Sequence, residues 1–213
     1  MLPEKIYVQN WEVDRRLIPF SFTRKELVDV ARKTFAERSN TIEVDVAGAA
    51  GQLAYIHGSR HLRLLATSKG YEVSRQKNIE SSKHLKTGIM ISYQNVDLAC
   101  SEMHSPKAIS GKKSGSAEAI EQAQGTLFTS KEAPSVVDIK SIRELNSSLW
   151  YLCVSFTEES FNAELSLPAS VTGDNFSGFF ERIFIARGQE WFGKPSETTA
   201  DDYAEFAPKI LRK

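Results

Sequence analysis

The sequence predicts an α+β protein in which N-terminal helices precede a small, mostly antiparallel sheet. Helical patterns fill the first part of the chain, whereas strand and helix patterns mix in the remainder. Of the 213 residues, 41% are hydrophobic, which is enough to build a substantial core. We expect residues 1–213 to form a single domain that contains an internal flexible loop at 105–116.

The clearest pattern is a hairpin near the C-terminal end. Residues 149–156 (LWYLCVSF) are apolar at almost every position, which is typical of a central strand covered on both faces. The polar residues 157–160 fit a short connection. From Phe161 to Leu167 apolar and polar residues alternate, and Pro168 then ends the strand because it donates no ladder hydrogen bond.

A Phe-rich helix is expected after this hairpin. It would begin at Asp174 or Asn175 as the N-cap and end at Gly188. Its apolar residues recur at helical spacing: Phe176, Phe179, Phe180, Ile183 and Phe184. Such a stripe is usually buried, here against the hairpin, and the alternative is an aromatic face exposed to a partner.

The N-terminal part predicts an edge strand or extended arm followed by two helices. Residues 4–13 place Ile6 and Val8 on one side of the arm. The next helix ends near residue 38 and starts with a capping box formed by Thr23 and Glu26. A longer helix is expected over 43–68, with a strand at 41–46 as the alternative.

Weaker patterns complete the prediction. Residues 71–86 are polar and basic and are expected to form a loop with a short extended piece. Residues 88–104 indicate one strand, or two with a kink near 94–95. Further helices are expected at 116–128, 134–145 and 199–207.

Composition limits where the protein acts. The chain has no apolar run of the ~20 residues that a membrane span needs. Its N-terminus carries acidic residues and has no apolar core of a signal peptide. Cys100 and Cys153 lie in apolar surroundings, so we expect free thiols and a cytoplasmic location.

The zero net charge hides an uneven distribution. Residues 51–115 carry ten basic and four acidic residues, whereas residues 150–213 carry six basic and ten acidic residues. Such asymmetry favours binding of nucleic acid or another polyanion, although solvated charge or attraction between the two parts explains it as well. The anion-binding candidates are Arg60, Arg63, Arg75, Lys77, Lys83, Lys112, Lys113 and Ser116.

The segment 110–116 (SGKKSGS) adds a local reason for this hypothesis. Its glycines and lysines precede a predicted helix that starts at Ser116, and unpaired N–H groups at a helix start attract anions. The segment lacks the spacing of a Walker A motif, and a solvated loop is the alternative.

Two groups of residues suggest metal chemistry. His57 and His61 are four apart on the predicted long helix and therefore share one face. Cys100, Glu102 and His104 alternate and would share a face if extended. Together they offer ligands that suit zinc, if the two groups meet. The alternative is that these side chains are unconnected, and the positive charges of Arg60 and Arg63 nearby weigh against a bound cation. The glutamate that a metalloprotease carries after its first histidine is absent, because Gly58 follows His57.

A magnesium-dependent nuclease is a further alternative. Residues 138–140 (DIK) have the tripeptide form of a restriction-type site, and Asp97 would supply the earlier acid. The predicted helix at 134–145 and the frequency of such tripeptides argue against this site.

The sequence therefore favours a binding protein for nucleic acid or an acidic protein, for which no cofactor is expected. One alternative is a metal-dependent hydrolase or nuclease that uses zinc or magnesium. Another is an oligomeric interaction protein joined through the hairpin edge or the Phe-rich helix.

Overall fold

The computed structural model describes residues 4–76, 79–109, 149–172 and 175–188. Its helices are α1 (Asn10–Leu17), α2 (Arg24–Ser39) and α3 (Ala49–Ser68), with a 3-10 turn η1 at Ile18–Phe20. Its strands are β1 (Lys5–Tyr7), β2 (Tyr71–Gln76), β3 (Ile79–His84), β4 (Met90–Asn95), β5 (Leu149–Phe156), β6 (Phe161–Pro168), β7 (Val171–Thr172), β8 (Asn175–Phe176) and β9 (Phe179–Ala186).

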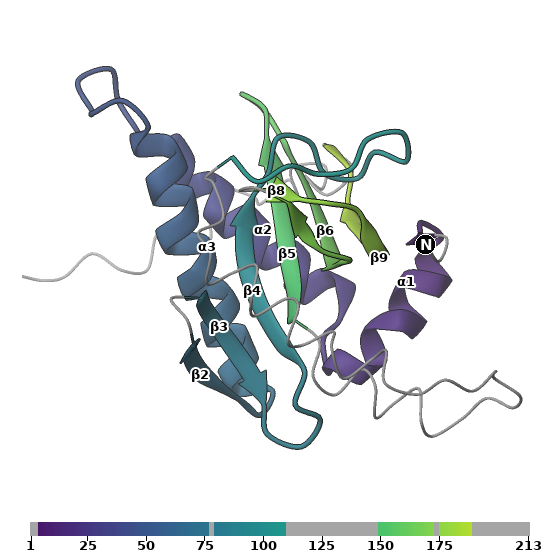
Figure 1. The fold of residues 1–213 in the computed structure, drawn as a ribbon. Helices are drawn as coiled ribbons and strands as arrows, with labels where there is room; N and C mark the ends of the chain where they lie inside the picture. The colour runs from purple at the N-terminus through teal and green to yellow at the C-terminus, as the bar shows by residue number, and fades with distance from the viewer. Residues whose placement is uncertain (1–3, 77–78, 110–148, 173–174, 189–213) are drawn as a thin grey trace, which may run out of the picture.

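Seven of these strands form one sheet in the order β1-β9-β6-β5-β4-β3-β2 (Figure 1). The pairs β4–β5 and β1–β9 are parallel, and the other neighbours are antiparallel. The small pair β7–β8 lies outside this sheet. The predicted α+β class with a mostly antiparallel sheet is confirmed.

The predicted hairpin is confirmed as β5 and β6, in the middle of the sheet. Alternate residues of β5 enter two different hydrophobic clusters, so both faces of this strand are covered, as its continuous apolar pattern predicts. Trp150, Leu152 and Val154 join the cluster beneath the helices. Tyr151 and Cys153 join a smaller cluster with Val96, Ala99, Phe176 and Phe179.

Local sequence explains how the helices begin. The capping box of α2 is present, because the Thr23 side chain accepts the Glu26 N–H while Glu26 accepts the Thr23 N–H. Residues 4–13 divide between an edge strand, β1, and the start of α1, which turns Val13 and Leu17 into the core. Pro19 lies in the first turn of η1, where a missing N–H costs nothing.

The predicted Phe-rich helix is wrong. Residues 175–188 instead contain β8 and the eight-residue strand β9, which lies between β6 and β1. Aromatic and β-branched residues suit a strand that is buried on both faces, and such a run also satisfies helical spacing. Gly178, with φ of 76°, supplies the turn into β9.

Two further segments differ from expectation. Residues 71–76 and 79–84 pair as the antiparallel strands β2 and β3 rather than forming a loop, and their place at the edge of the sheet tolerates their polar residues. The long helix begins at Ala49 rather than 43, because residues 42–48 form turns. There the Asp45 carboxylate accepts the Ile42 N–H, and Gly48 adopts a φ of 83°.

The predicted strand over 88–104 is β4, followed by an irregular segment that returns to pair Val96 with Ala108.

Strands β5 and β6 are each hydrogen-bonded to a neighbouring strand on both sides, so the hairpin offers no free edge for oligomerisation. The helices expected at 116–128, 134–145 and 199–207, the loop at 110–116 and the tripeptide at 138–140 all lie outside the described residues.

None of the helices in the described part of the chain is long and apolar enough to cross a membrane.

Candidate functional site

Helices α2 and α3 pack against each other on one side of the molecule (Figure 1). They bring together one carboxylate and two imidazoles. Glu37 lies near the end of α2, and His57 and His61 lie on successive turns of α3. One ligand atom from each residue lies within 4.8 Å of the other two. The Nδ1 atom of His57 is 3.6 Å from Oε1 of Glu37.

These distances suit a metal ion better than a direct hydrogen bond. A separation of 3.6 Å between His57 Nδ1 and Glu37 Oε1 is too long for a hydrogen bond. Two ligand atoms that each lie ~2.0–2.2 Å from a tetrahedral ion are separated by roughly 3.4 Å. The Glu37–His57 separation is close to that value, and the third donor lies within 4.8 Å of both.

Two nitrogen atoms at this site lack the partners that buried polar atoms usually have. His57 Nδ1 and His61 Nε2 are both buried and accept no hydrogen bond from the described residues. Burial lowers the pKa of His61, and the nearby charge of Lys33 lowers it further. A neutral imidazole is the form that binds metals, so His61 is prepared for that role at neutral pH.

Two cations border the three donors. Lys33 is four residues before Glu37 on α2, and Arg60 directly precedes His61 on α3. Both side chains are exposed, and both act on the charge of His61. Neither forms an ion pair with another residue in the described ranges.

The second predicted metal group has other partners. The Cys100 thiol donates to the carbonyl oxygens of Ala163 and Ala186. His104 Nε2 is 3.0 Å from Asp97 Oδ2. Among the residues that the structure describes, no donor of this group joins the histidines of α3.

Glu102 is likewise engaged elsewhere, because its carboxylate accepts a hydrogen bond from Arg187. Residues 98–104 are irregular rather than extended, and Cys100 has a φ of 60°. The alternation that would place Cys100, Glu102 and His104 on one face is therefore absent.

The structure describes four of the eight candidate anion-binding residues. Arg63 and Arg75 both form ion pairs with Glu80, which neutralises part of their charge. Arg60 and Lys83 are exposed. Lys77, Lys112, Lys113 and Ser116 lie outside the described residues, so polyanion binding stays a prediction.

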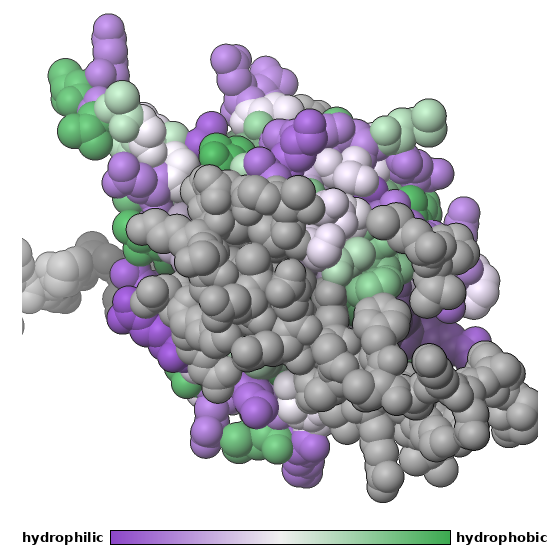
Figure 2. Space-filling view, in the orientation of Figure 1, coloured by the Kyte–Doolittle hydropathy of each residue, from purple (hydrophilic) through white to green (hydrophobic). Residues whose placement is uncertain are grey.

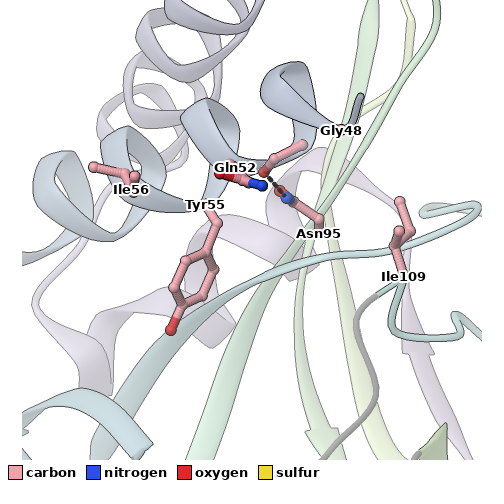
Figure 3. A pocket seen from close by; sticks show the side chains of 7 residues that line it. Gly48, Gln52, Tyr55, Ile56, Asn95 and Ile109 are labelled. Atoms are coloured by element: carbon pink, nitrogen blue, oxygen red, sulfur yellow. Dashed lines mark hydrogen bonds between the residues drawn. The ribbon is translucent and has the colours of Figure 1, made fainter. Parts of the chain in front are cut away.

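A separate groove of about 500 Å³ lies on another side of α3, between its first turns and the end of β4 (Figure 3). Asn95 forms part of the wall and donates from Nδ2 to the Gly51 carbonyl oxygen at 2.8 Å. The lining is largely apolar: Gly48, Gly51, Gln52, Tyr55, Ile56, Asn95 and Ile109. The groove contains no charged side chain among these residues.

The turn segment that precedes α3 exposes apolar side chains. Ile42, Val44 and Val46 are 65%, 86% and 72% exposed. Figure 2 shows hydrophobic atoms at the tip of this segment, at the upper left of the molecule. Hydrophilic atoms adjoin these hydrophobic atoms on the same tip.

Sequence spacing identified the two histidines but not the carboxylate. Glu37 precedes His57 by twenty positions and lies on another helix, so no local motif joins them. Its position near the C-terminal end of α2, at the packing contact with α3, brings it to the site. Comparison of the chain with family models, curated proteins and solved structures found no match.

Proposed function

We propose that this protein binds a divalent transition-metal ion of the zinc class through Glu37, His57 and His61. The observation that supports the proposal is the pair of buried imidazole nitrogens, without hydrogen-bond partners, beside one carboxylate. Imidazole and carboxylate ligands together suit zinc and its neighbours in the first transition row. Calcium and magnesium, in contrast, prefer oxygen ligands alone.

The proposed site has the composition of zinc centres that keep a reactive position open. Three protein ligands leave the fourth tetrahedral position to water or another small ligand. The Glu37 side chain is 38% exposed, so solvent reaches this side of the site. An ion held in this way lowers the pKa of its bound water, which is the basis of metal-assisted hydrolysis.

Metal content after equilibrium dialysis tests the proposal. The chain is dialysed against zinc at a series of low concentrations, and bound zinc is measured by mass spectrometry. We expect about one equivalent per chain, with affinity reduced by at least ~100-fold in His57→Ala, His61→Ala and Glu37→Gln, because loss of a direct ligand costs more than loss of an outer partner.

His104→Ala is the matched control, because this imidazole is partly exposed and contacts Asp97 instead of the proposed site. We expect it to retain wild-type zinc affinity. If His104→Ala lost zinc while His57→Ala and His61→Ala kept it, the site would be at the loop that follows β4. If wild-type protein held no zinc, the proposal would fail.

A further inference from the structure

We infer that the metal bound at Glu37, His57 and His61 takes a phosphate monoester as its fourth ligand, with Lys33 and Arg60 binding the remaining phosphate oxygens. This inference rests on the proposed metal site and adds the class of ligand that it selects. It assigns a role to two cations that the proposed metal coordination leaves unused.

Helical spacing places both cations at the border of the site. Residues four apart on a helix are neighbours on one face, so Lys33 lies one turn from Glu37 on α2. Arg60 is three residues after His57 and adjacent to His61 on α3. The two charges therefore come from different helices and flank the same three donors.

The balance of charge favours an anion at the open position. A divalent ion exceeds the single negative charge of Glu37, since both imidazoles are neutral when they bind metal. Lys33 and Arg60 add two positive charges whose electrostatic effect extends to His61. Water would leave this excess uncompensated, whereas a dianionic phosphate offsets most of it.

The number of donors distinguishes phosphate from carboxylate. A phosphate monoester presents three terminal oxygens, one for the ion and one each for Lys33 and Arg60. A carboxylate has only two oxygens, so one of them would have to serve two of these three partners. The planar guanidinium of Arg60 also fixes the direction of its hydrogen bond to the phosphate, which adds geometric selectivity.

The same cations have opposite effects on the two bound species. They repel a divalent metal and attract an anion, so removing their charge should tighten metal binding slightly and weaken phosphate binding. A side chain that only stabilised the helices would change neither affinity in this paired way. The two opposite signs make the inference testable separately from the metal site.

Cobalt(II) is a suitable probe, because its visible absorption reports both its binding and any change of ligand. Cobalt is titrated into the metal-free chain first, and phenyl phosphate is then titrated into the loaded protein. We expect Lys33→Gln and Arg60→Gln each to weaken phenyl phosphate binding about tenfold, the loss of one charge-assisted hydrogen bond. Their cobalt affinity should be equal to or slightly above that of the wild type.

Arg32→Gln is the matched control, since it removes an exposed positive charge that pairs with Asp29 on the same helix. It should leave phenyl phosphate affinity unchanged, and acetate should bind the wild type at least tenfold more weakly than phenyl phosphate. If the Lys33→Gln, Arg60→Gln double variant bound cobalt and phenyl phosphate as the wild type does, the inference would be overturned and the metal site would stand. Absence of cobalt binding by the wild type would overturn both.

Discussion

Arg182 and Glu164 form a doubly hydrogen-bonded ion pair inside the sheet, between neighbouring strands β9 and β6. Arg182 Nε donates to Glu164 Oε1 at 2.8 Å, and Nη2 donates to Oε2 at 2.7 Å. Their side chains are only 1% and 0% exposed. Such a pair is tolerated in a core only when its other hydrogen-bonding atoms are also satisfied.

The surrounding contacts satisfy that condition. Arg182 Nη1 donates to the carbonyl oxygens of Ser101 and His104. Glu164 accepts the Cys100 N–H and the Ser166 hydroxyl. Through these hydrogen bonds the ion pair holds residues 100–104, in the irregular segment after β4, against the face of the sheet opposite the helices.

Removing the charge of Glu164 should destabilise the protein strongly. Glu164→Gln leaves the buried Arg182 guanidinium with only the partly exposed Glu4 carboxylate, 3.8 Å from its Nε, as a counterion. We therefore expect a loss of about 3 kcal/mol in the free energy of unfolding, at the lower end of the range for a broken buried pair. Urea unfolding measures it. Arg32→Gln breaks an exposed pair and should cost less than about 1 kcal/mol. Similar losses in both variants would contradict the assigned role of the buried pair.

Two glycines of α3 should respond to alanine in opposite directions. A Cβ at Gly58 would overlap the ring of Tyr93, whereas a Cβ at Gly51 meets no other atom within 4 Å. We expect Gly58→Ala to destabilise by about 1–3 kcal/mol through overpacking. Gly51→Ala should stabilise by up to about 1 kcal/mol through helix propensity. Thermal or urea unfolding of the two variants decides the matter, and a stabilising Gly58→Ala would place α3 away from β4.

Both cysteines should resist alkylation in the folded protein. They are free thiols, Cys153 is fully buried, and burial raises the pKa of Cys100 far above neutrality. Because the thiolate is the reactive form, iodoacetamide should label neither residue near neutral pH until urea unfolds the chain. Mass spectrometry counts the labels. Rapid labelling of Cys100 in native protein would show that its loop is not fastened to the sheet.

Asp97 should contribute stability that acid removes. Partial burial acts to raise the pKa of its carboxyl group, but N–H groups of Lys107 and Leu98 outweigh this effect and lower the pKa below 3.8. The folded form therefore holds its proton less tightly than the unfolded form. The contribution is complete above the unfolded pKa and is lost as pH falls through the lowered value. Urea unfolding from about pH 6 to about pH 2 should show a shallower acid loss for Asp97→Asn.

Sequence patterning identified the parts of this fold in which local signals agree with burial. The capping box of Thr23 and Glu26 located α2 because both side-chain contacts are local. The double-faced pattern of β5 located the centre of the sheet. Alternation located β6 as the hairpin partner of β5, but the side of β6 expected to face water is largely buried, because Glu164 and Ser166 are both 0% exposed.

The errors arose where tertiary context determines the structure. Phe179, Phe180, Ile183 and Phe184 fit a helical stripe, yet pairing with β6 and β1 makes β9 a strand. The distant partner Glu164, eighteen positions before Arg182, could not be predicted from local spacing. Glu37 was missed for the same reason, since only helix packing brings it to His57.

An anomalous difference map from crystals grown with zinc tests the proposed metal site most directly. Data collected on both sides of the zinc absorption edge locate the ion independently of any assumption about its ligands. We expect one strong peak between α2 and α3, about 2.0–2.2 Å from one nitrogen of His57, one nitrogen of His61 and a Glu37 oxygen. A peak beside His104 and Asp97 instead, or no peak at saturating zinc, would contradict the proposal.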